Sequence, residues 1–585
     1  MTSAKKGLYL RSMKKKIQHL FSYFLLLLVC GNSTHAQLFH KKNYPQDYFI
    51  WPVKAQVAIV ANFGEMRANH YHMGLDCRTD QRENVPVLAA ADGYISRINI
   101  DANGFGRAIY IDHPNGYTTV YAHLNDFEPA LHRYVVEEQY KQQSWKLNMA
   151  IPANRFTVKK GQFIAYSGNT GGSLGAHLHF EIRDTKSELV LNPLLFGLPI
   201  PDKVSPLISK LSMYDRTKST YEQSPTTFSL NKTGNSYQIA GGTITSRSPK
   251  VSFAITATDA YSGSNNPNGI YRALLIQDNQ PICGFEMDSI HYNETRGLNA
   301  HIDFKTKSSG GSYLQHVSRL PGYVNSIYKT ADNTNGIIDL TDGKLHTIVI
   351  DVFDTEDNRS KLTFNIIYPG GASTAAMSEK NETVFRPEKP NLVENELFSI
   401  QLPAFHIYDV FSFKQQASVN GHGNPVCQIH KDKVPVHGYY PVRMKGSFPL
   451  SDTGSIIMKQ TALGKIRYKK TVYVNGMYEA PAREFGVFEL LCDKQAPTLT
   501  ALDGFKDGCS VRGKKTIAFQ ATDNTETIFH FQATIDDQWI LCSNDKEKAF
   551  VYRIDDKCPP GEHLLRVVVT DLAGNTTEKN YRFSN

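Results

Sequence analysis

Short runs of β-branched and aromatic residues, punctuated by glycine, recur along most of this 585-residue chain. In residues 45–200 they are bounded by turn pairs such as Asp92-Gly93 and Asn115-Gly116. These pairs favour tight hairpin turns, and short runs between turn signals are typical of antiparallel strands. The runs lie at residues 86–90, 94–98, 108–111 and 117–121. The sequence therefore predicts a mainly β protein.

The chain is too long for one hydrophobic core, since domains usually hold roughly 100–200 residues. Its hydrophobic content of 41% and aromatic content of 11% are typical of globular proteins. We expect a first domain over residues 37–200. A more polar stretch at residues 128–157 interrupts it, which we interpret as an insertion at its rim with room for a short helix.

The sequence repeats itself after residue 200, each time near a strand-like run. Residues 202–206 are echoed by 493–497, residues 257–259 by 521–523, and residues 354–358 by 571–575. This pattern predicts two Ig-like β-sandwich modules, at 201–370 and 491–585. Residues 371–490 are predicted to be a polar, Pro-containing linker followed by a further β-rich domain.

The first 36 residues have six lysines and arginines and no acidic residue, followed by the apolar run 21–29 and Thr34-His35-Ala36. This order is typical of a secretory signal peptide, so we expect an exported protein of the periplasm or cell envelope, or a secreted one. A membrane anchor is the alternative, but the run is shorter than the roughly 20 residues that span a bilayer. Lipidation at Cys30 is a further alternative that the bulky Val29 disfavours. We expect no integral membrane span after signal removal.

The formal charge of +8 is mostly due to that segment, because its six cations leave about +2 for the rest of the chain. This weak basicity argues against a nucleic-acid partner. Seven cysteines follow residue 36, and four of them lie after residue 491. An oxidising compartment permits disulfides between them, and the odd number leaves Cys77 as our candidate for a free thiol.

Metal-binding chemistry is concentrated in the first domain. His72 and Asp76 lie four residues apart with Gly74 between them, so both side chains can reach one ion. His177 and His179 lie two residues apart on a predicted strand and therefore share a face. His123 ends the strand-like run from residue 117 and offers another imidazole. Two nitrogens and one carboxylate oxygen suit a catalytic zinc ion with an open fourth position.

Other residues compete for these roles. We expect His70 to lie on the solvent side of its loop. We expect the Glu181 side chain to face away from the groove, with a structural role as a partner of Arg183 or of a backbone donor. A second, loose group has no regular spacing, and we interpret it as ordinary packing rather than a metal site; it comprises His422, Cys427, His430 and His437.

The order of the motifs resembles the lysostaphin-type, or LytM-domain, peptidoglycan metallopeptidases. The matching elements are the residues 62–67, the His72-x-Gly-x-Asp76 motif, the residues 85–93, Tyr121-x-His123-Leu124, the residues 161–162, the residues 167–171, His177-Leu178-His179-Phe180-Glu181 and the residues 191–193. They cover roughly residues 50–195. The resemblance implies a small antiparallel β domain with an open groove.

The resemblance also implies roles. His72, Asp76 and His179 correspond to the three zinc ligands, and His177 and His123 to the catalytic histidines. All five positions are filled, which distinguishes the chain from inactive relatives that have lost ligands. Two departures from the pattern are Cys77 after the aspartate and the long insertion at 128–157.

The residues alone specify metal-assisted hydrolysis, and the resemblance supplies the substrate class. We therefore expect a zinc metalloendopeptidase that cuts stem peptides or cross-links of peptidoglycan. Its expected partners are peptidoglycan peptides, with other envelope proteins as candidates for the β modules. Two alternatives are a silent wall-binding or amidase-activating protein on the same fold, and a secreted peptidase acting on ordinary proteins.

Overall fold

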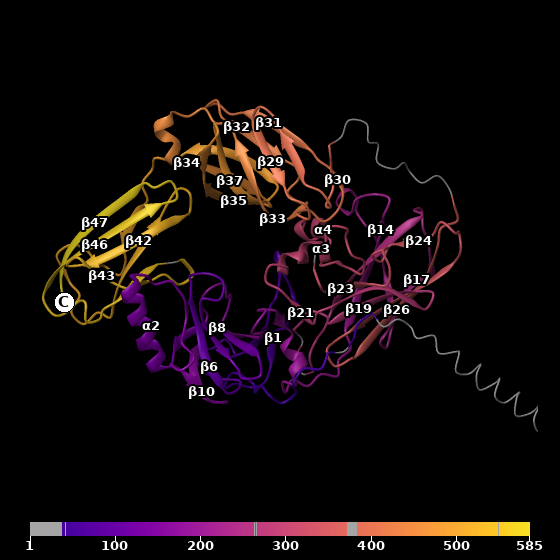
Figure 1. Cartoon of the computed structure of the whole chain (residues 1–585), viewed down its shortest axis with the longest axis horizontal. Helices are drawn as coiled ribbons and strands as arrows, with labels where there is room; N and C mark the ends of the chain where they lie inside the picture. Colours follow the sequence, from indigo (N-terminus) through magenta and orange to yellow (C-terminus); the bar gives the residue numbers. More distant parts are fainter. Residues whose placement is uncertain are drawn as a thin grey trace, which may run out of the picture.

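The computed structural model describes residues 38–40, 42–262, 264, 266–323, 325–370, 383–547 and 549–585. The predicted signal peptide, Cys30 and residues 371–382 of the predicted linker lie outside these residues. The described chain is mainly β, as expected. Its four parts follow one another around a ring, and the last part lies against the first (Figure 1). Within the described ranges, no helix is long and apolar enough to cross a bilayer.

The first domain is built on one large antiparallel sheet. Its main path is β1 (Ile59–Ala61), β4 (Leu75–Arg78), β12 (His177–Asp184), β8 (Tyr117–Phe127), β7 (Arg107–Asp112), β6 (Gly93–Ile100) and β10 (Thr157–Val158). Further strands join at its sides: β5 (Pro86–Leu88), β9 (Leu147–Ala150), β11 (Phe163–Ser167) and β13 (Val190–Leu191). A short hairpin of β2 (Met66–Arg67) and β3 (His70–Tyr71) precedes β4.

The polar insertion contains one helix, α2 (Pro129–Gln142). Proline at its first position and the Glu128 carboxylate, which accepts from the amides of Ala130 and Leu131 at 3.0 and 2.6 Å, begin the helix. Gln143 ends it in the left-handed conformation.

Residues 201–370 form two sheets, here called the first module. One contains β15 (Thr226–Phe228), β14 (Leu207–Asp215), β18 (Lys250–Thr258), β22 (Gln315–His316) and β24 (Ile338–Asp339). The other contains β16 (Leu230–Thr233), β17 (Ser236–Thr245), β26 (Arg359–Ile367), β25 (His346–Phe353), β19 (Arg272–Gln277), β20 (Gln280–Glu286) and β23 (Tyr328–Thr330). Two short helices, α3 (Leu298–His301) and α4 (Phe304–Ser308), lie between strands of the module.

Residues 383–490 form the middle region. One of its sheets contains β28 (Asn391–Glu394), β29 (Phe398–Leu402), β33 (Pro435–Met444), β37 (Met477–Glu484) and β36 (Val472–Val474). The other contains β31 (Gln415–Val419), β32 (Pro425–Ile429), β38 (Gly486–Cys492), β34 (Ile456–Ala462) and β35 (Lys465–Lys470). The pair β27 (Val384–Phe385) and β30 (Phe411–Ser412) stands beside them.

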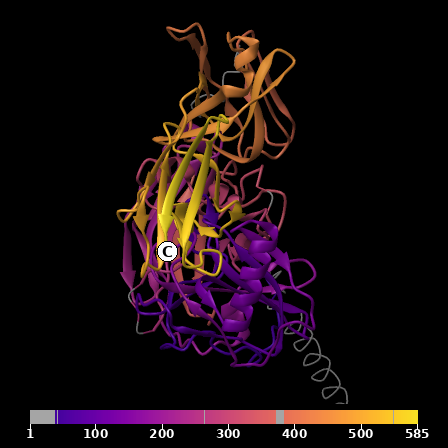
Figure 2. The same ribbon diagram turned by 90° about the vertical axis from the view of Figure 1, so that its left-hand side faces the viewer.

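The last module, residues 491–585, also has two sheets. One contains β39 (Thr498–Ala501), β41 (Thr516–Thr522), β45 (Phe550–Arg553) and β44 (Cys542–Ser543). The other contains β40 (Cys509–Ser510), β47 (Thr576–Ser584), β46 (Glu562–Asp571), β42 (Ile528–Ile535) and β43 (Gln538–Trp539). The module extends between the middle region and the first domain (Figure 2).

Buried apolar side chains form one large cluster in the first domain and one in the last module. A third cluster runs from Phe63, Tyr71, Met73 and Val190 of the first domain through the first module and the middle region. The first module and the middle region therefore share a continuous core, so they pack as one unit. The seven described cysteines, Cys77 among them, are free thiols.

The first domain contacts both of its neighbours in the ring. Strand β13 pairs with β21 (Ser289–Ile290) of the first module, so the large sheet continues across the boundary. At the other end, Arg107 forms a double hydrogen bond with Asp545 of the last module at 2.9 and 3.0 Å. Tyr140 of α2 donates a hydrogen bond to Asp555 of the same module. The insertion is thus part of the surface on which the last module docks.

Candidate metal centre

Three side chains with metal-ligating atoms meet near strands β4 and β12. The antiparallel register places Asp76 directly opposite His179, and His72 lies just before β4. His72 Nε2 is 2.9 Å from Asp76 Oδ1 and 3.0 Å from His179 Nδ1, and His179 Nδ1 is 3.0 Å from Asp76 Oδ1. All three residues are buried. They form a group able to hold one metal ion, as the sequence motifs predict.

The second nitrogen of each imidazole is held by a fixed acceptor. His72 Nδ1 donates to the carbonyl of Asn62 at 2.7 Å, and His179 Nε2 lies 2.9 Å from Glu181 Oε1. Such bonds fix the tautomer and leave the other nitrogen's lone pair directed at the ion. His72 Nε2 and His179 Nδ1 are therefore the nitrogens oriented to bind metal, so the donor set fits the ion that the sequence predicts.

Asp76 lies at the centre of this charge network. Its Oδ2 accepts a hydrogen bond from Arg67 at 2.8 Å, which leaves Oδ1 facing the histidines. Burial opposes ionisation of Asp76, but His72, His177 and His179 outweigh it and hold its pKa well below the usual range. Burial likewise disfavours the charged form of His179, yet Asp76 and Glu181 raise its pKa to about 9. The Asp76 carboxylate is thus ionised and able to bind a cation.

The two remaining histidines of the predicted set lie beside the group. The ring centroid of His123 is 4.9 Å from that of His177 and 5.8 Å from that of His179. His123 sits where the β7 to β8 register shifts, with a φ of 59°, and this β-bulge turns its side chain out of the strand's alternation. Burial, His179 and His177 lower the pKa of His123 to about 3. His123 is therefore neutral at physiological pH.

Backbone carbonyls orient both of these imidazoles. His123 Nδ1 donates to the carbonyl of Thr170 and His177 Nδ1 to that of Gly175, each at 2.8 Å. His177 Nε2 faces the metal group, 3.3 Å from Asp76 Oδ1. The glycine-rich segment 168–176, here called the groove loop, thus supplies an acceptor for each histidine. Each Nδ1–H group is therefore held by a backbone carbonyl.

Our prediction for the Glu181 side chain is wrong. Residues 177, 179 and 181 share one face of β12 because side chains alternate along a strand, so Glu181 points toward the metal group instead of away from it. It is fully buried, it bonds His179, and its Oε2 accepts from Arg183 Nε at 2.7 Å. The predicted pairing with Arg183 is correct. Because side chains two residues apart on a strand share a face, the sequence could have predicted that Glu181 supports His179.

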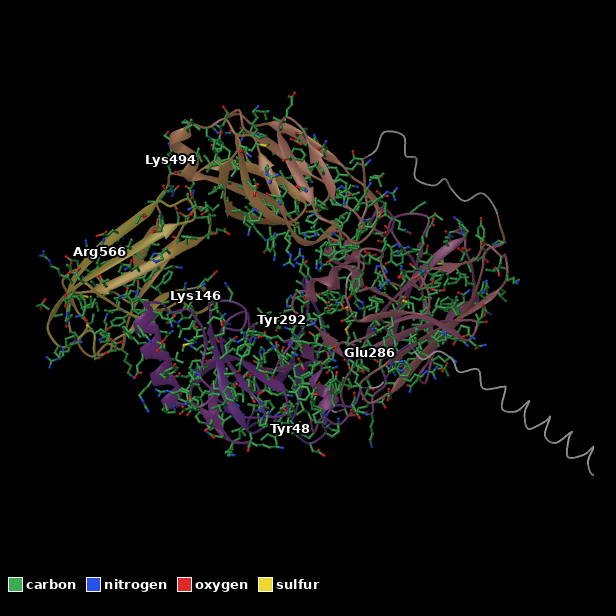
Figure 3. All side chains as sticks on the ribbon, in the orientation of Figure 1. Tyr48, Lys146, Glu286, Tyr292, Lys494 and Arg566 are labelled. Carbon is green, nitrogen blue, oxygen red and sulfur yellow. The ribbon has the colours of Figure 1, made fainter. Side chains whose placement is uncertain are left out.

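Tyr292 reaches this site from the first module. It follows β21, which pairs with β13 at the domain boundary, and its hydroxyl donates a hydrogen bond to Glu181 Oε1. Figure 3 places it where the first domain meets the first module. Tyr292 also lies over the Arg183 guanidinium, 4.9 Å from ring centroid to Cζ. No motif of the first domain could have indicated a residue more than 100 positions further along the chain.

A groove of about 830 Å³ is lined by His72, Asp76, His123, His177 and His179. Its walls include Phe105, Tyr292 and the groove loop, whose tip residue Leu174 is fully exposed. His70, predicted on the solvent side, is exposed at the rim. From the last module, Lys546 Nζ donates to Asn169 Oδ1 at 2.8 Å and to the Ser173 carbonyl at 2.7 Å. The groove thus borders three parts of the chain and is open in this structure.

Among the described residues, the metal-ligating groups do not include the loose histidine and cysteine cluster of the middle region. His430 stacks on Phe411 with ring centroids 4.5 Å apart, and Cys427 is buried in the core. His430 and Cys427 thus pack as the sequence predicts.

Two histidines and one carboxylate meet at a single point, with two further imidazoles beside them, and this donor set suits a catalytic metal ion. Residues 70–141 match the family model described as Peptidase family M23, a span that includes His72, Asp76 and His123. This confirms the resemblance of the first domain to the lysostaphin-type peptidases. Residues 382–493 match the model of a Zu5-like domain.

Curated relatives match the same part of the chain. An uncharacterised metalloprotease of Haemophilus influenzae is 32% identical over 155 residues, which are 26% of this chain and 27% of that protein. DD-carboxypeptidase/endopeptidase Mpg of Neisseria meningitidis is 33% identical over 131 residues, 22% of this chain and 24% of that protein. Murein hydrolase activator NlpD of Salmonella typhimurium is 32% identical over 133 residues, 23% and 27% of the two chains. The match thus spans about a quarter of each relative.

Two solved structures are also similar. A zinc-containing peptidase from Vibrio cholerae has 26% identity and a TM-score of 0.19 over 25% of this chain and 39% of that chain. The catalytic domain of lysostaphin from Staphylococcus simulans has 23% identity and a TM-score of 0.17 over 23% of this chain and 86% of that chain.

Proposed function

We propose that this chain is an exported zinc metalloendopeptidase that hydrolyses peptide bonds in the stem peptides or cross-links of peptidoglycan. The observation that carries the proposal is the convergence of His72 Nε2, Asp76 Oδ1 and His179 Nδ1, with His123 and His177 alongside. All three ligand atoms lie within 4.8 Å of one another. A relative that had lost catalysis would not need all five side chains.

Zinc is the metal that this donor set favours. Two imidazole nitrogens and one carboxylate oxygen are the three protein ligands of many catalytic zinc sites, in which the fourth position is open. When bound, zinc supplies Lewis acidity toward a carbonyl oxygen and toward water. Glu181 and the Asn62 carbonyl would hold the ligand imidazoles in their binding tautomers.

His123 and His177 are proposed to move the protons. A neutral imidazole can take a proton from the attacking water and deliver one to the leaving amine. The carbonyls of Thr170 and Gly175 would hold the two Nδ1–H groups throughout, so each Nε2 acts as the exchanging atom. Leu174 and Phe105 at the groove walls offer apolar contact to a bound peptide.

The substrate class is inferred from the relatives. Mpg is named a carboxypeptidase and endopeptidase, and NlpD a murein hydrolase activator. The basic, then apolar, segment at residues 1–36 supports export to the compartment where peptidoglycan lies. Together they favour cell-wall peptides over ordinary proteins as the substrate.

The test is digestion of purified sacculi with zinc-loaded protein, followed by mass spectrometry of the muropeptides. We expect new amine termini at one type of peptide bond. His177→Ala should abolish their release while one zinc ion stays bound. His132→Ala, a matched change of a half-exposed histidine on α2, should cleave like the wild type.

Two results would contradict the proposal. Zinc-loaded protein that leaves sacculi intact but stimulates an amidase would be a non-enzymatic activator. Protein that digests casein but releases nothing from sacculi would be a peptidase of ordinary proteins.

A further inference from the structure

The three repeated sequence motifs of the two modules meet in space, once in each module. Asp202, Asp259 and Asp354 place carboxylate oxygens within 4.8 Å of one another in the first module, and Asp493, Asp523 and Asp571 do so in the last. All are buried except Asp523, which is half-buried. The repeats therefore encode a common carboxylate cluster at equivalent positions.

The two clusters agree in topology. The first aspartate lies five residues before a strand, β14 or β39, and the second directly follows the strand that pairs with it, β18 or β41. Even the register is the same, since Leu207 pairs with Thr258 and Thr498 with Thr522. The third aspartate lies at the end of β25 or β46, before the hairpin turn of the second sheet. Both clusters thus join the two sheets at one end of the module.

The third aspartate is fixed in the same way in both modules. Asp354 accepts from the backbone and the side-chain amide of Asn358 at 2.9 and 2.7 Å. Asp571 accepts the two corresponding bonds from Asn575, each at 2.8 Å. Such bonds hold a carboxylate in a set orientation without neutralising its charge.

The other two aspartates leave the same oxygen without a partner in each module. Oδ1 of the first aspartate accepts a backbone amide, from Val204 at 2.9 Å or from Gln495 at 3.1 Å. Oδ2 of the first aspartate, Asp202 or Asp493, is buried and has no hydrogen-bond donor. Oδ1 of the second aspartate, Asp259 or Asp523, is likewise buried and has no donor. Buried polar atoms are normally paired. The repetition of one unpaired pattern indicates a missing ligand.

The first cluster has one more unpaired oxygen. Asn268 pairs with Asp259 through two backbone hydrogen bonds of 3.0 and 2.7 Å, so their side chains leave the ladder on the same side. Asn268 is 3% exposed, and its Oδ1 has no donor. Asn268 therefore offers a fourth side-chain oxygen beside the three aspartates of the first cluster.

The charges in the first cluster repel one another. Burial and the carboxylates of Asp202 and Asp354 raise the pKa of Asp259 to about 8. Uncompensated buried charge costs several kcal/mol, and a cation among the oxygens would offset it.

We propose that each module binds one calcium ion, held by Asp202, Asp259, Asp354 and Asn268 in the first module and by Asp493, Asp523 and Asp571 in the last. The ligand set is all oxygen, which selects a hard cation over zinc. Magnesium keeps several of its waters and suits a buried site poorly, whereas calcium accepts a variable set of six to eight oxygens.

Calcium would act on the junctions of the ring. Asp202 follows the last residues of the first domain, and Asp493 directly follows β38 of the middle region. Next to Asn268, Gly269 exchanges two hydrogen bonds with the Asn62 side chain at 2.8 and 2.9 Å, and the Asn62 carbonyl holds His72. The first ion would therefore steady the loop that supports a residue of the metal centre.

The test uses the full chain, stripped of cations and recharged with one equivalent of zinc. Calorimetric titration with calcium chloride should give two ions per chain. Asp259→Asn and Asp523→Asn should each remove one ion, and the double variant both. The matched controls Asp339→Asn and Asp537→Asn change exposed carboxylates of the same modules and should keep two.

Thermal unfolding gives a second readout. The difference in unfolding temperature between Asp259→Asn and the wild type should change sign when calcium is added. Without calcium, Asp259→Asn should unfold at a higher temperature than the wild type, because one repelling carboxylate is gone. With calcium, the wild type should unfold at the higher temperature. A wild-type titration without binding heat up to about 10 mM calcium, above the range of extracellular calcium modules, would overturn the proposal. So would an Asp259→Asn variant more stable than the wild type in both buffers.

Discussion

The hydroxyl of Tyr292 donates a hydrogen bond to Glu181, the carboxylate that also bonds the metal-site residue His179. Tyr292 belongs to the first module and Glu181 to the first domain. The support of His179 is thus completed by a neighbouring part of the chain. A first domain cut out at residue 200 would lack this bond.

Changing Glu181 and Tyr292 should give graded losses of zinc affinity. Partners of ligand histidines are typically worth 10–100-fold in metal affinity. We expect Glu181→Gln to fall in that range, because the amide cannot serve as a charged acceptor for both His179 and Arg183. Tyr292→Phe should cost only several-fold, since Glu181 keeps its other two partners. Competition with a zinc chelator measures both affinities.

Tyr166→Phe provides the control for Tyr292, because Tyr166 is a partly exposed tyrosine of the first domain that packs on Phe163. Its zinc affinity should match that of the wild type. Equal affinities for the wild type, Glu181→Gln and Tyr292→Phe would show that His179 needs no such support.

The motifs predicted that His72, Asp76 and His179 lie together, because they fall on two short segments, residues 72–76 and 177–179, that meet in one sheet. Glu181 could have been predicted from the same alternation that grouped His177 with His179. Tyr292 and Lys546 could not, because they reach the groove from modules whose placement depends on packing between distant surfaces. The repeats were visible in the sequence, but only the paired strands reveal that their aspartates meet.

Zinc should stabilise the first domain against unfolding. A ligand at about 100 times its Kd adds roughly 2.7 kcal/mol to the free energy of unfolding when it binds only the folded state. We expect a higher unfolding temperature for the first domain in zinc than after chelation, measured by differential scanning calorimetry without calcium. His179→Ala should lose this increase, whereas His132→Ala should keep it. An equal zinc effect in His179→Ala would place the ion elsewhere.

The stability of the first module should depend on pH through His346. This buried imidazole lies 2.6 Å from Asp278 and 3.1 Å from Asp342, and Asp278 first, then Asp342, raise its pKa against the effect of burial. A raised pKa in the folded state stabilises the fold below the unfolded value of about 6.5, and this contribution is lost as pH rises through the folded pKa. The wild type should therefore exceed Asp278→Asn in stability at pH 5.5.

The difference in the free energy of unfolding between the wild type and Asp278→Asn should shrink as pH rises through the raised pKa of His346. Urea unfolding of both proteins over this range measures it, with Asp332→Asn, an exposed change in the same module, as the control. A gap that stays constant, or that widens with pH, would mean that His346 does not carry the charge.

Lys546 should matter for catalysis although it lies far from the motifs. Its ammonium group holds Asn169 and the Ser173 carbonyl in the groove loop, and the same loop provides the carbonyls of Thr170 and Gly175 that orient His123 and His177. Lys546→Ala should therefore lower kcat for peptide release several-fold and speed hydrogen exchange in residues 169–175, with zinc content unchanged. Lys506→Ala, a change of an exposed lysine of the same module, should alter neither. If Lys546→Ala instead cleaves faster than the wild type, the contact between the last module and the groove loop lowers activity. The positioning role predicted for Lys546 would then be wrong.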